Sequence, residues 1–309
     1  MTRIVAKFVA LGLLIVVTYS LLWLIPPKPY LVYASLLDKQ QRLVNIPAPR
    51  LIFVGGSGVA LGLDSALIET KVNRPVLNMG VNAGFGLHYM LAQVQPWVQP
   101  GDIVLIVPEY EHFYGDLVEG DQNLLWALRI QPEMVWQLSW QQLLHLLPDL
   151  PVFIQQRMQE IARSRPDPIY NRNAFTAHGD FVNHLDLPST PLALSAIDAG
   201  NTINGRALQL LADFRHEVEQ QGGQVYLIYP AIAESFWAFG KNRQVIETLN
   251  SAILQQNVMQ PLTTPAAAVW PDPMFFDTVY HLTRQGRQLR SELLAERLAV
   301  LLGSKVTAK

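Results

Sequence analysis

Apolar and polar positions divide the chain into one long apolar run near its start and many short apolar segments after residue 50. Four of the short segments are apolar without alternation, and glycine, proline or polar residues flank each one. Such continuous runs are typical of strands that helices cover on both faces, as in a parallel sheet. The expected strands are 51–55, 75–80, 102–107 and 224–229.

Apolar residues at helical spacing precede the fourth strand and recur near the end of the chain. One helix is expected over 203–221, after the capping candidates Asn201 and Thr202 and before two glycines. Another is expected over 285–302, where leucines recur on one face. Strands that alternate with helices predict an α/β domain with a mostly parallel sheet, arranged as a three-layer α/β/α sandwich.

The long apolar run predicts a membrane anchor. Residues 8–25 carry no charge, Arg3 and Lys7 precede them, and a proline pair follows. A hydrocarbon core of ~30 Å needs ~20 helical residues, so an anchor over residues 1–27 is long enough to cross it once. The preceding positive charges predict a cytoplasmic N-terminus, with the main domain outside the inner (plasma) membrane. A cleavable signal peptide is the alternative, although residues 23–27 offer no small-x-small cleavage site.

The remaining chain is interpreted as two parts. Residues 28–50 are expected to form a juxtamembrane connector, and residues 51–309 one α/β domain. Between the third and fourth strands, a helical insertion at about 116–200 is rich in leucine and tryptophan. Its helices have four open interpretations: a lid, a surface for acyl chains, a platform at the bilayer interface, or ordinary helices packed on the sheet.

Composition excludes several classes of function. The formal net charge of −2 provides no basic surface for nucleic acid. The chain has no cysteine, so disulfides, thiol catalysis and cysteine-bound zinc are excluded. His178, Asp180 and His184 lie close together, but their spacing matches no common metal-ligand pattern. We therefore expect neither a metal nor a cofactor.

Three residues form a candidate catalytic triad. Ser57 lies in the sequence GGSG directly after the first strand, where open α/β sheets place their ligands. Asp277 and His281 precede the last helix and can return to the same edge. A serine nucleophile needs an imidazole to take its proton and a carboxylate to orient that imidazole. Taken singly, Ser57 is an ordinary turn residue and the other two are structural; their joint order favours a triad.

These motifs resemble the SGNH (GDSL-type) hydrolase and acyltransferase superfamily, which has a flavodoxin-like fold. The sequence Gly55-Gly56-Ser57 is similar to the "GDS" block, and "NMGVNAGFG" at 78–86 is similar to the second block. "DTVYHLTRQG" at 277–286 is similar to the final Asp–His block, although His281 follows Asp277 by four positions where the family usually has three. The third block usually supplies an asparagine, which is missing from "PEYEHFYG".

The resemblance also implies an oxyanion hole and substrate contacts. Its backbone donors are expected to be the amide of Ser57 and that of Ala83 or Gly84, and Tyr110 is a candidate substitute for the missing asparagine. Glu109 and Glu111 accept hydrogen bonds when ionised, so they are expected to order the loop or contact substrate. The expected substrate contacts, all weakly indicated, are Asn82, Glu109, Tyr110, Glu111 and His178.

The function implied by the resemblance is a serine O-acyltransferase or esterase. The chain is similar to the membrane-anchored, extracytoplasmic branch associated with O-acylation of polysaccharides or cell walls. Its substrate is expected to be an acylated glycan, and a multipass O-acyltransferase is a possible partner. Two alternatives remain: an esterase without a partner, and a non-catalytic glycan-binding or scaffold subunit of an export complex.

Overall fold

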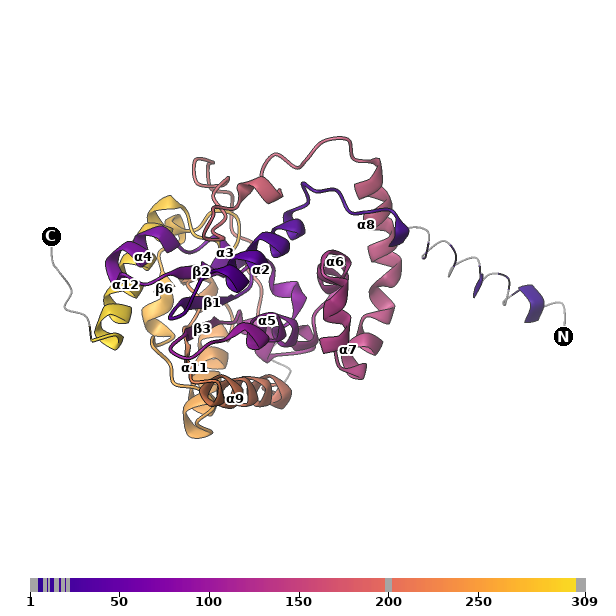
Figure 1. The fold of residues 1–309 in the computed structure, drawn as a ribbon. Helices are drawn as coiled ribbons and strands as arrows, with labels where there is room; N and C mark the ends of the chain where they lie inside the picture. Colours follow the sequence, from indigo (N-terminus) through magenta and orange to yellow (C-terminus); the bar gives the residue numbers. More distant parts are fainter. Residues whose placement is uncertain are drawn as a thin grey trace.

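A four-stranded parallel sheet forms the centre of the domain in the computed structural model, which describes residues 5–7, 10, 12–13, 17, 20, 23–197 and 202–303 (Figure 1). The strand order is β2-β1-β3-β4, and every neighbouring pair is parallel. Two further short strands, β5 and β6, pair in parallel beside it. The strands are β1 (Leu51–Gly55), β2 (Val76–Asn78), β3 (Ile103–Val107), β4 (Gln224–Leu227), β5 (Ile232–Ala233) and β6 (Val269–Trp270).

Helices connect the strands and surround the sheet. The α-helices are α2 (Ser35–Asn45), α3 (Ser57–Ala60), α4 (Ser65–Val72), α5 (Leu87–Val94), α6 (Gln122–Ile130), α7 (Trp140–His145), α8 (Leu150–Ala162), α9 (Gly205–Gln220), α10 (Glu234–Ala238), α11 (Asn242–Gln255) and α12 (Arg284–Leu301). The 3-10 helices are η1 (Val32–Ala34), η2 (Ala83–Phe85), η3 (Gln95–Trp97), η4 (Tyr110–Phe113), η5 (Leu117–Glu119), η6 (Pro132–Gln137), η7 (Leu147–Asp149), η8 (Arg172–Ala174), η9 (Ala266–Ala268) and η10 (Asp272–Met274).

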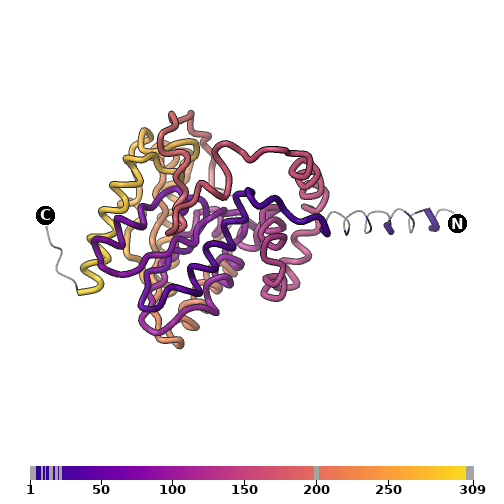
Figure 2. The backbone as a smooth tube through the Cα atoms, turned by 45° about the horizontal axis from the view of Figure 1, so that its top comes forward, coloured from indigo at the N-terminus to yellow at the C-terminus, as the bar shows by residue number. Residues whose placement is uncertain are grey.

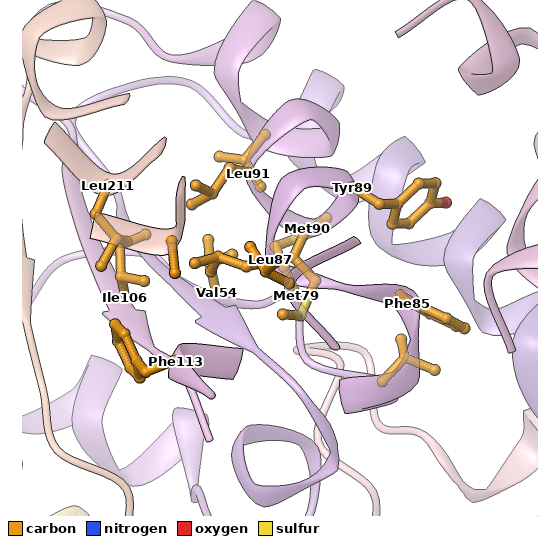
Figure 3. Close-up of a cluster of buried hydrophobic side chains, with 14 of the residues drawn as sticks. Val54, Met79, Phe85, Leu87, Tyr89, Met90, Leu91, Ile106, Phe113 and Leu211 are labelled. Atoms are coloured by element: carbon orange, nitrogen blue, oxygen red, sulfur yellow. The ribbon is translucent and has the colours of Figure 1, made fainter. Parts of the chain in front are cut away.

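One face of the sheet packs against α5 and α9. Alternate residues of a strand point to opposite faces, so Val54 and Ile106 lie on the same side. Both belong to a buried cluster with Met90 of α5 and Leu211 of α9 (Figure 3). These strand residues are fully or almost fully buried, because the helices cover them completely.

The other face packs against α4 and α12. Phe53 and Leu105 point to this side and share a buried cluster with Ile68 of α4 and Leu298 of α12. The two helices lie side by side, α12 being the yellow helix in Figures 1 and 2. The expected α/β architecture with a parallel sheet is thus confirmed, and helices lie on both faces of the sheet.

Most predicted elements are confirmed with small shifts at their ends. β1 has the expected bounds, and the helices expected over 203–221 and 285–302 are α9 and α12. The segment interpreted as a connector, 28–50, carries α2, whose leucines Leu36 and Leu43 are fully buried. This segment therefore packs into the domain, because its apolar residues recur at helical spacing.

The predicted anchor, 1–27, falls largely outside the described residues. Among the residues that the structure does describe, no helix combines the length and the hydropathy needed to cross a membrane. At the end of this segment, the backbone carbonyls of Ile25 and Pro26 accept hydrogen bonds from Arg157 of α8.

Candidate active site

Ser57 opens α3 at the carboxyl end of β1, an inner strand of the sheet. Two glycines precede it because three segments meet there. A Cβ atom on Gly56 would lie 2.7 Å from Glu109 Oε1 and 2.8 Å from Ala83 N. Real Cβ atoms essentially never approach so closely, so only glycine lets the loops after β1, β2 and β3 come together. The serine therefore lies at the expected edge of the sheet.

Asp277 and His281 face each other on the loop that precedes α12. His281 Nδ1 lies 2.7 Å from Asp277 Oδ1, so the four-residue spacing allows the pair to form. The loop is tightly closed: Phe276 N–H donates to the carbonyl of His281, and the Thr278 hydroxyl accepts from His281 N–H. Because an ionised Asp277 only accepts hydrogen bonds, the neutral imidazole carries its proton on Nδ1, which leaves Nε2 free to accept one.

Tyr170 completes the support of Asp277. Its hydroxyl donates to Asp277 Oδ2 at 2.5 Å. Burial raises the pKa of Asp277, but the hydrogen bonds from His281 and Tyr170 outweigh burial and leave this pKa below its usual value. The carboxylate therefore stays ionised and available to orient the imidazole. Burial and the bond to Asp277 raise the pKa of Tyr170, which remains a donor.

The serine loop and the histidine loop meet at the Glu109 carboxyl. Glu109 Oε1 accepts from Gly58 N–H at 3.2 Å, and a hydrogen bond joins the same carboxyl to the Ser57 side chain. The charge of a protonated His281 lowers the pKa of Glu109, so the imidazole lies near enough to influence this carboxyl. A Cβ on Gly58 would lie 3.4 Å from Cβ of Tyr280, the residue before His281. Ser57 and His281 thus lie on two loops in contact.

Glu109 is buried, and its protonation differs from that of an ordinary glutamate. Burial, together with the neighbouring Glu111, raises its pKa to about 7. The hydrogen bonds from Gly58 and Ser57 and the charge of His281 act in the opposite direction but are outweighed. Near neutral pH, Glu109 exists in both forms beside the serine, so it is able to donate a hydrogen bond as well as accept one.

The loop after β2 places only one of the two alternative oxyanion donors beside the serine. Ala83 N lies against Gly56, next to Ser57. Gly84 N–H donates to Asn82 Oδ1 at 2.7 Å, and a Cβ on Gly84 would meet the Asp121 carboxylate. Ala83 is therefore the better placed donor, while Asn82 caps the 3-10 helix η2.

The other two candidate residues of the β3 loop, the buried Tyr110 and the half-buried Glu111, have different contacts. Glu111 accepts a hydrogen bond from the Tyr280 hydroxyl at 2.7 Å, and burial raises its pKa. The Tyr110 ring stacks on Tyr229, with ring centroids 6.4 Å apart, and its hydroxyl has no hydrogen-bond partner among the described residues. Tyr110 N–H donates to the Tyr280 hydroxyl at 3.4 Å. Tyr280 thus fastens the β3 loop to the histidine loop.

His178 is not brought together with the triad. Its Nε2 lies 3.3 Å from Glu69 Oε2 on α4, and it lines a cavity of about 210 Å³ with Lys39 and Arg42. No contact joins its side chain to Ser57 or His281 within the described part of the chain. The substrate contact expected of His178 therefore lacks structural support.

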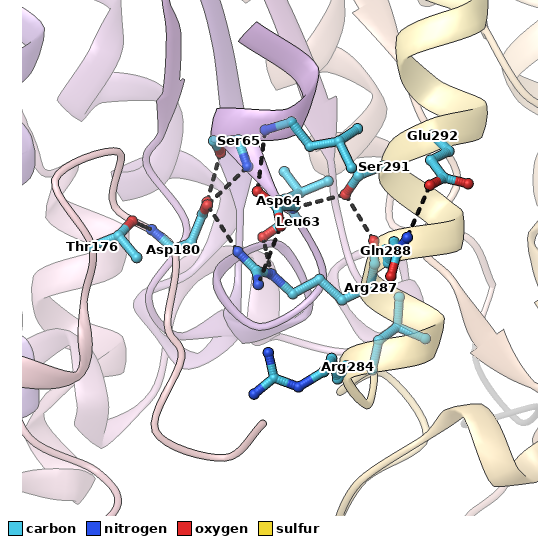
Figure 4. Close-up of polar contacts among 12 residues, drawn as sticks. Leu63, Asp64, Ser65, Thr176, Asp180, Arg284, Arg287, Gln288, Ser291 and Glu292 are labelled. Carbon is cyan, nitrogen blue, oxygen red and sulfur yellow. Dashed lines mark hydrogen bonds and ion pairs between the residues drawn. The ribbon is translucent and has the colours of Figure 1, made fainter. Parts of the chain in front are cut away.

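The histidines and aspartate considered for a metal site have structural contacts. Asp180 accepts hydrogen bonds from Ser65 N–H and its hydroxyl and from Arg287 (Figure 4). His184 Nε2 lies 2.9 Å from the carbonyl of Leu282, directly after His281. In the described ranges, no group of three histidine, aspartate or glutamate side chains could hold a metal ion.

Three contributors to this site carry no recognisable sequence signal. Tyr170 lies in an irregular segment 107 residues before the carboxylate that it supports. Tyr280 and Arg290 lie near the triad in sequence, yet their roles depend on tertiary contacts. Arg290, buried on α12, donates to the carbonyl of Gly58 at 3.1 Å and so holds the serine turn from behind.

The structure thus gathers Ser57, Ala83, Glu109, Asp277 and His281 at one edge of the sheet. The arrangement supplies a hydroxyl, an oriented imidazole and backbone hydrogen-bond donors, which are the groups that acyl transfer through a serine requires. No protein-family model matches the chain, and no curated protein matches it either. The geometry of this site and the sequence motifs are therefore the basis for assigning a function.

Proposed function

We propose that this protein is a serine O-acyltransferase or esterase of the SGNH (GDSL-type) superfamily, with Ser57, His281 and Asp277 as its triad. The observation that carries the proposal is the 2.7 Å contact between His281 and an ionised Asp277, on a loop packed against the serine turn. This pairing is what a general base needs to take a serine proton.

The proposed reaction proceeds in two steps. His281 Nε2 takes the hydroxyl proton as Ser57 Oγ attacks the ester carbonyl, and the resulting oxyanion receives hydrogen bonds from Ser57 N–H and Ala83 N–H. The protonated imidazole then gives its proton to the departing alkoxide, which leaves an acyl-serine. Water or an acceptor hydroxyl reverses these roles, so the products are an acid or a new ester.

The proposed substrate is an acylated glycan outside the cytoplasm. Two features of the sequence support it: the uncharged run 8–25 preceded by Arg3 and Lys7, and the resemblance of residues 81–86 and 108–113 to the membrane-anchored branch. A chain held in this way is placed to receive acyl groups from a multipass O-acyltransferase in the same membrane. Transfer to a glycan hydroxyl is then favoured over simple hydrolysis.

A fluorophosphonate probe tests the proposal directly, because it phosphonylates only an activated serine. The full chain in detergent micelles should label, and Ser57→Ala and His281→Ala should both abolish labelling while folding is unchanged. Ser251→Ala, on the exposed surface of α11, is the matched control and should label like the unaltered chain. Absence of labelling, or labelling that persists in Ser57→Ala, would refute the triad.

A second candidate function is a non-catalytic glycan-binding subunit. It is favoured by the carboxyl of Glu109 beside Ser57, since an ionised group there opposes formation of an oxyanion. This alternative predicts that the unaltered chain and the Ser57→Ala variant both fold and bind polysaccharide equally well, and that neither reacts with the probe.

A further inference from the structure

The insertion between β3 and β4 presents an unusually apolar surface. Two tryptophans are almost fully exposed, Trp136 of η6 at 86% and Trp140 of α7 at 81%. Leu144 and Leu147, on the same short stretch of chain, are more than half exposed. Tryptophan contributes a large apolar area, and contiguous exposed areas of this kind mark interaction sites.

An apolar groove lies on the same elements. It has a volume of about 430 Å³ and is lined only by apolar side chains. Its lining includes Leu143 of α7, Leu146 directly after α7, and Leu125 and Leu128 of α6. The remaining lining residues are Trp23, Pro132, Val135, Leu147 and Leu150.

Residues 23–25, at the end of the uncharged run, lie beside this groove. Trp23 lines it, and the Arg129 guanidinium lies 4.8 Å from the centre of the Trp23 ring. Arg129 also donates to the carbonyl of Ile25 at 2.5 Å. In Figure 1, α6, α7 and α8 gather on the side of the domain where this part of the chain arrives. The uncharged run 8–25 therefore ends beside the exposed tryptophans.

We infer that this surface, made by η6, α7 and η7, rests on the lipid bilayer that holds the N-terminal run, with an acyl chain of a lipid in the groove. Tryptophan is favoured where hydrocarbon meets headgroups, which matches Trp136 and Trp140 next to an anchor. The groove has the size of a ligand site, and its lining is mainly apolar, which suits an acyl chain. The inference rests on the proposed anchor and not on the triad.

Tryptophan fluorescence of the full chain in phosphatidylcholine nanodiscs tests the inference. Lipids brominated on their acyl chains should quench the unaltered chain strongly. The variant with Trp136→Phe and Trp140→Phe should lose part of this quenching, and Trp23 in the groove should account for the remainder. Trp237→Phe, on α10, is the matched control and should leave the quenching unchanged. Equal quenching in the double variant would overturn the inference, as would a chain that does not insert into nanodiscs.

A lipid with a photoreactive acyl chain tests the groove itself. Irradiation should attach it to peptides from 125–150. Labelling confined to residues before Trp23 would overturn occupation of the groove, and cross-linking to another copy of the chain would show that the surface binds protein instead.

A different observation concerns the chemistry at Ser57. Glu109 Oε1 and Ala83 N lie within 2.8 Å of one point, the position that a Cβ on Gly56 would take. The carboxyl therefore lies across from a proposed oxyanion donor and is hydrogen-bonded to the Ser57 side chain. Asparagine, which donates to the oxyanion in the superfamily that the chain resembles, is missing from this loop.

The structure assigns to Glu109, in its protonated form, the role of the missing oxyanion donor. An ionised carboxylate has only acceptors to offer, whereas a protonated one donates its O–H, and the proton stays on Glu109 throughout the reaction. The role rests on the proposed nucleophile Ser57, and it corrects the sequence-based expectation that Glu109 acts only as an acceptor.

The surroundings of Glu109 favour the protonated form. Its pKa is raised to about 7 by burial and by Glu111 of η4, against the opposing charge of His281. The other titratable group that faces it is Tyr280, on the histidine loop. Arg290 of α12 reaches the carbonyl of Gly58 behind the serine turn. The donor is therefore present below about pH 7 and is lost as pH rises through this value.

The pH dependence of probe labelling tests this role. The rate of the unaltered chain should fall above about pH 7, about tenfold for each pH unit. Glu109→Gln keeps a neutral donor, so at acid pH its labelling rate should be within about tenfold of that of the unaltered chain. Its rate should not decrease above about pH 7, because the glutamine side chain does not ionise. Glu109→Ala should label roughly 10²–10³-fold more slowly at every pH.

Glu111→Gln is the matched control, because it alters the neighbouring buried carboxyl, which bonds Tyr280 rather than Ser57. It should keep the fall and move it to lower pH, since Glu111 raises the pKa of Glu109. A Glu109→Gln chain as slow as Glu109→Ala, or one with an unchanged pH profile, would overturn the role of Glu109. Absence of Ser57-dependent labelling at every pH would instead refute the proposed nucleophile, and with it this role.

Discussion

Gly56 is the position where one added methyl group tests the proposed site most directly. A Cβ there would lie 2.8 Å from N and Cα of Ala83, whereas ordinary contacts begin at 3.4 Å. The backbone of Ala83 must then retreat by about 0.6 Å, and a misplacement of ~1 Å costs an active site about 10²-fold in rate. Overpacking of this kind also destabilises a fold by ~1–3 kcal/mol.

Gly56→Ala should therefore slow fluorophosphonate labelling of Ser57 by one to two orders of magnitude while the chain still folds. Circular dichroism and thermal unfolding in detergent micelles would measure the accompanying loss of stability. Gly205→Ala is the control, because no atom lies within 4 Å of its Cβ position at the start of α9. That variant should label normally and gain up to ~1 kcal/mol from helix propensity. Normal labelling of Gly56→Ala would refute the convergence of loops at Ser57.

Three further variants test the electrostatics of the fold and the site. Tyr170→Phe removes a donor to Asp277, so the pKa of that carboxyl rises and the acid limb of labelling should move to higher pH; an unmoved limb would contradict the contact. Asp102→Ala removes the carboxylate that pairs with the buried Arg50 guanidinium and should cost ~3–5 kcal/mol of unfolding free energy. Asp186→Ala, which breaks the exposed pair with Arg284, should cost less than ~1 kcal/mol, and equal losses in the two variants would contradict this reasoning. Burial lowers the pKa of Lys39 to about 7, so the unfolded chain binds more protons above this pH, and stability relative to Lys39→Met should rise toward pH 9 rather than stay constant.

The sequence predicts the sheet well because the relevant signal is local. Each central strand is a continuous apolar run between turn residues, and burial on both faces leaves no room for polar alternation. Ser57 is equally predictable, since its position follows from the end of β1. Asp277 and His281 are close in the chain, so their contact requires only a closed loop, which Thr278 and Phe276 provide.

The remaining features depend on contacts that no local pattern encodes. Tyr170 reaches Asp277 from the far end of the insertion, and nothing in its neighbourhood identifies it as a supporting residue. The raised pKa of Glu109 is a consequence of burial, so the sequence alone presents this residue as an ordinary acceptor. The surroundings of His178 also depend on tertiary contacts: the sequence places it in a polar loop, and the fold sets its imidazole 3.3 Å from Glu69.

The insertion between β3 and β4 is anchored to the triad too firmly to act as a detachable lid. Tyr170 donates to Asp277, His184 contacts the carbonyl of Leu282, and Asp180 pairs with Arg287 of α12. Opening this end would break the hydrogen bond from Tyr170 to Asp277 and remove the Asp180 carboxylate from the buried Arg287 guanidinium, which is costly. The other end of the same insertion carries the exposed tryptophans. One insertion therefore carries both the hydrogen bond that supports Asp277 and the surface that we propose rests on the bilayer.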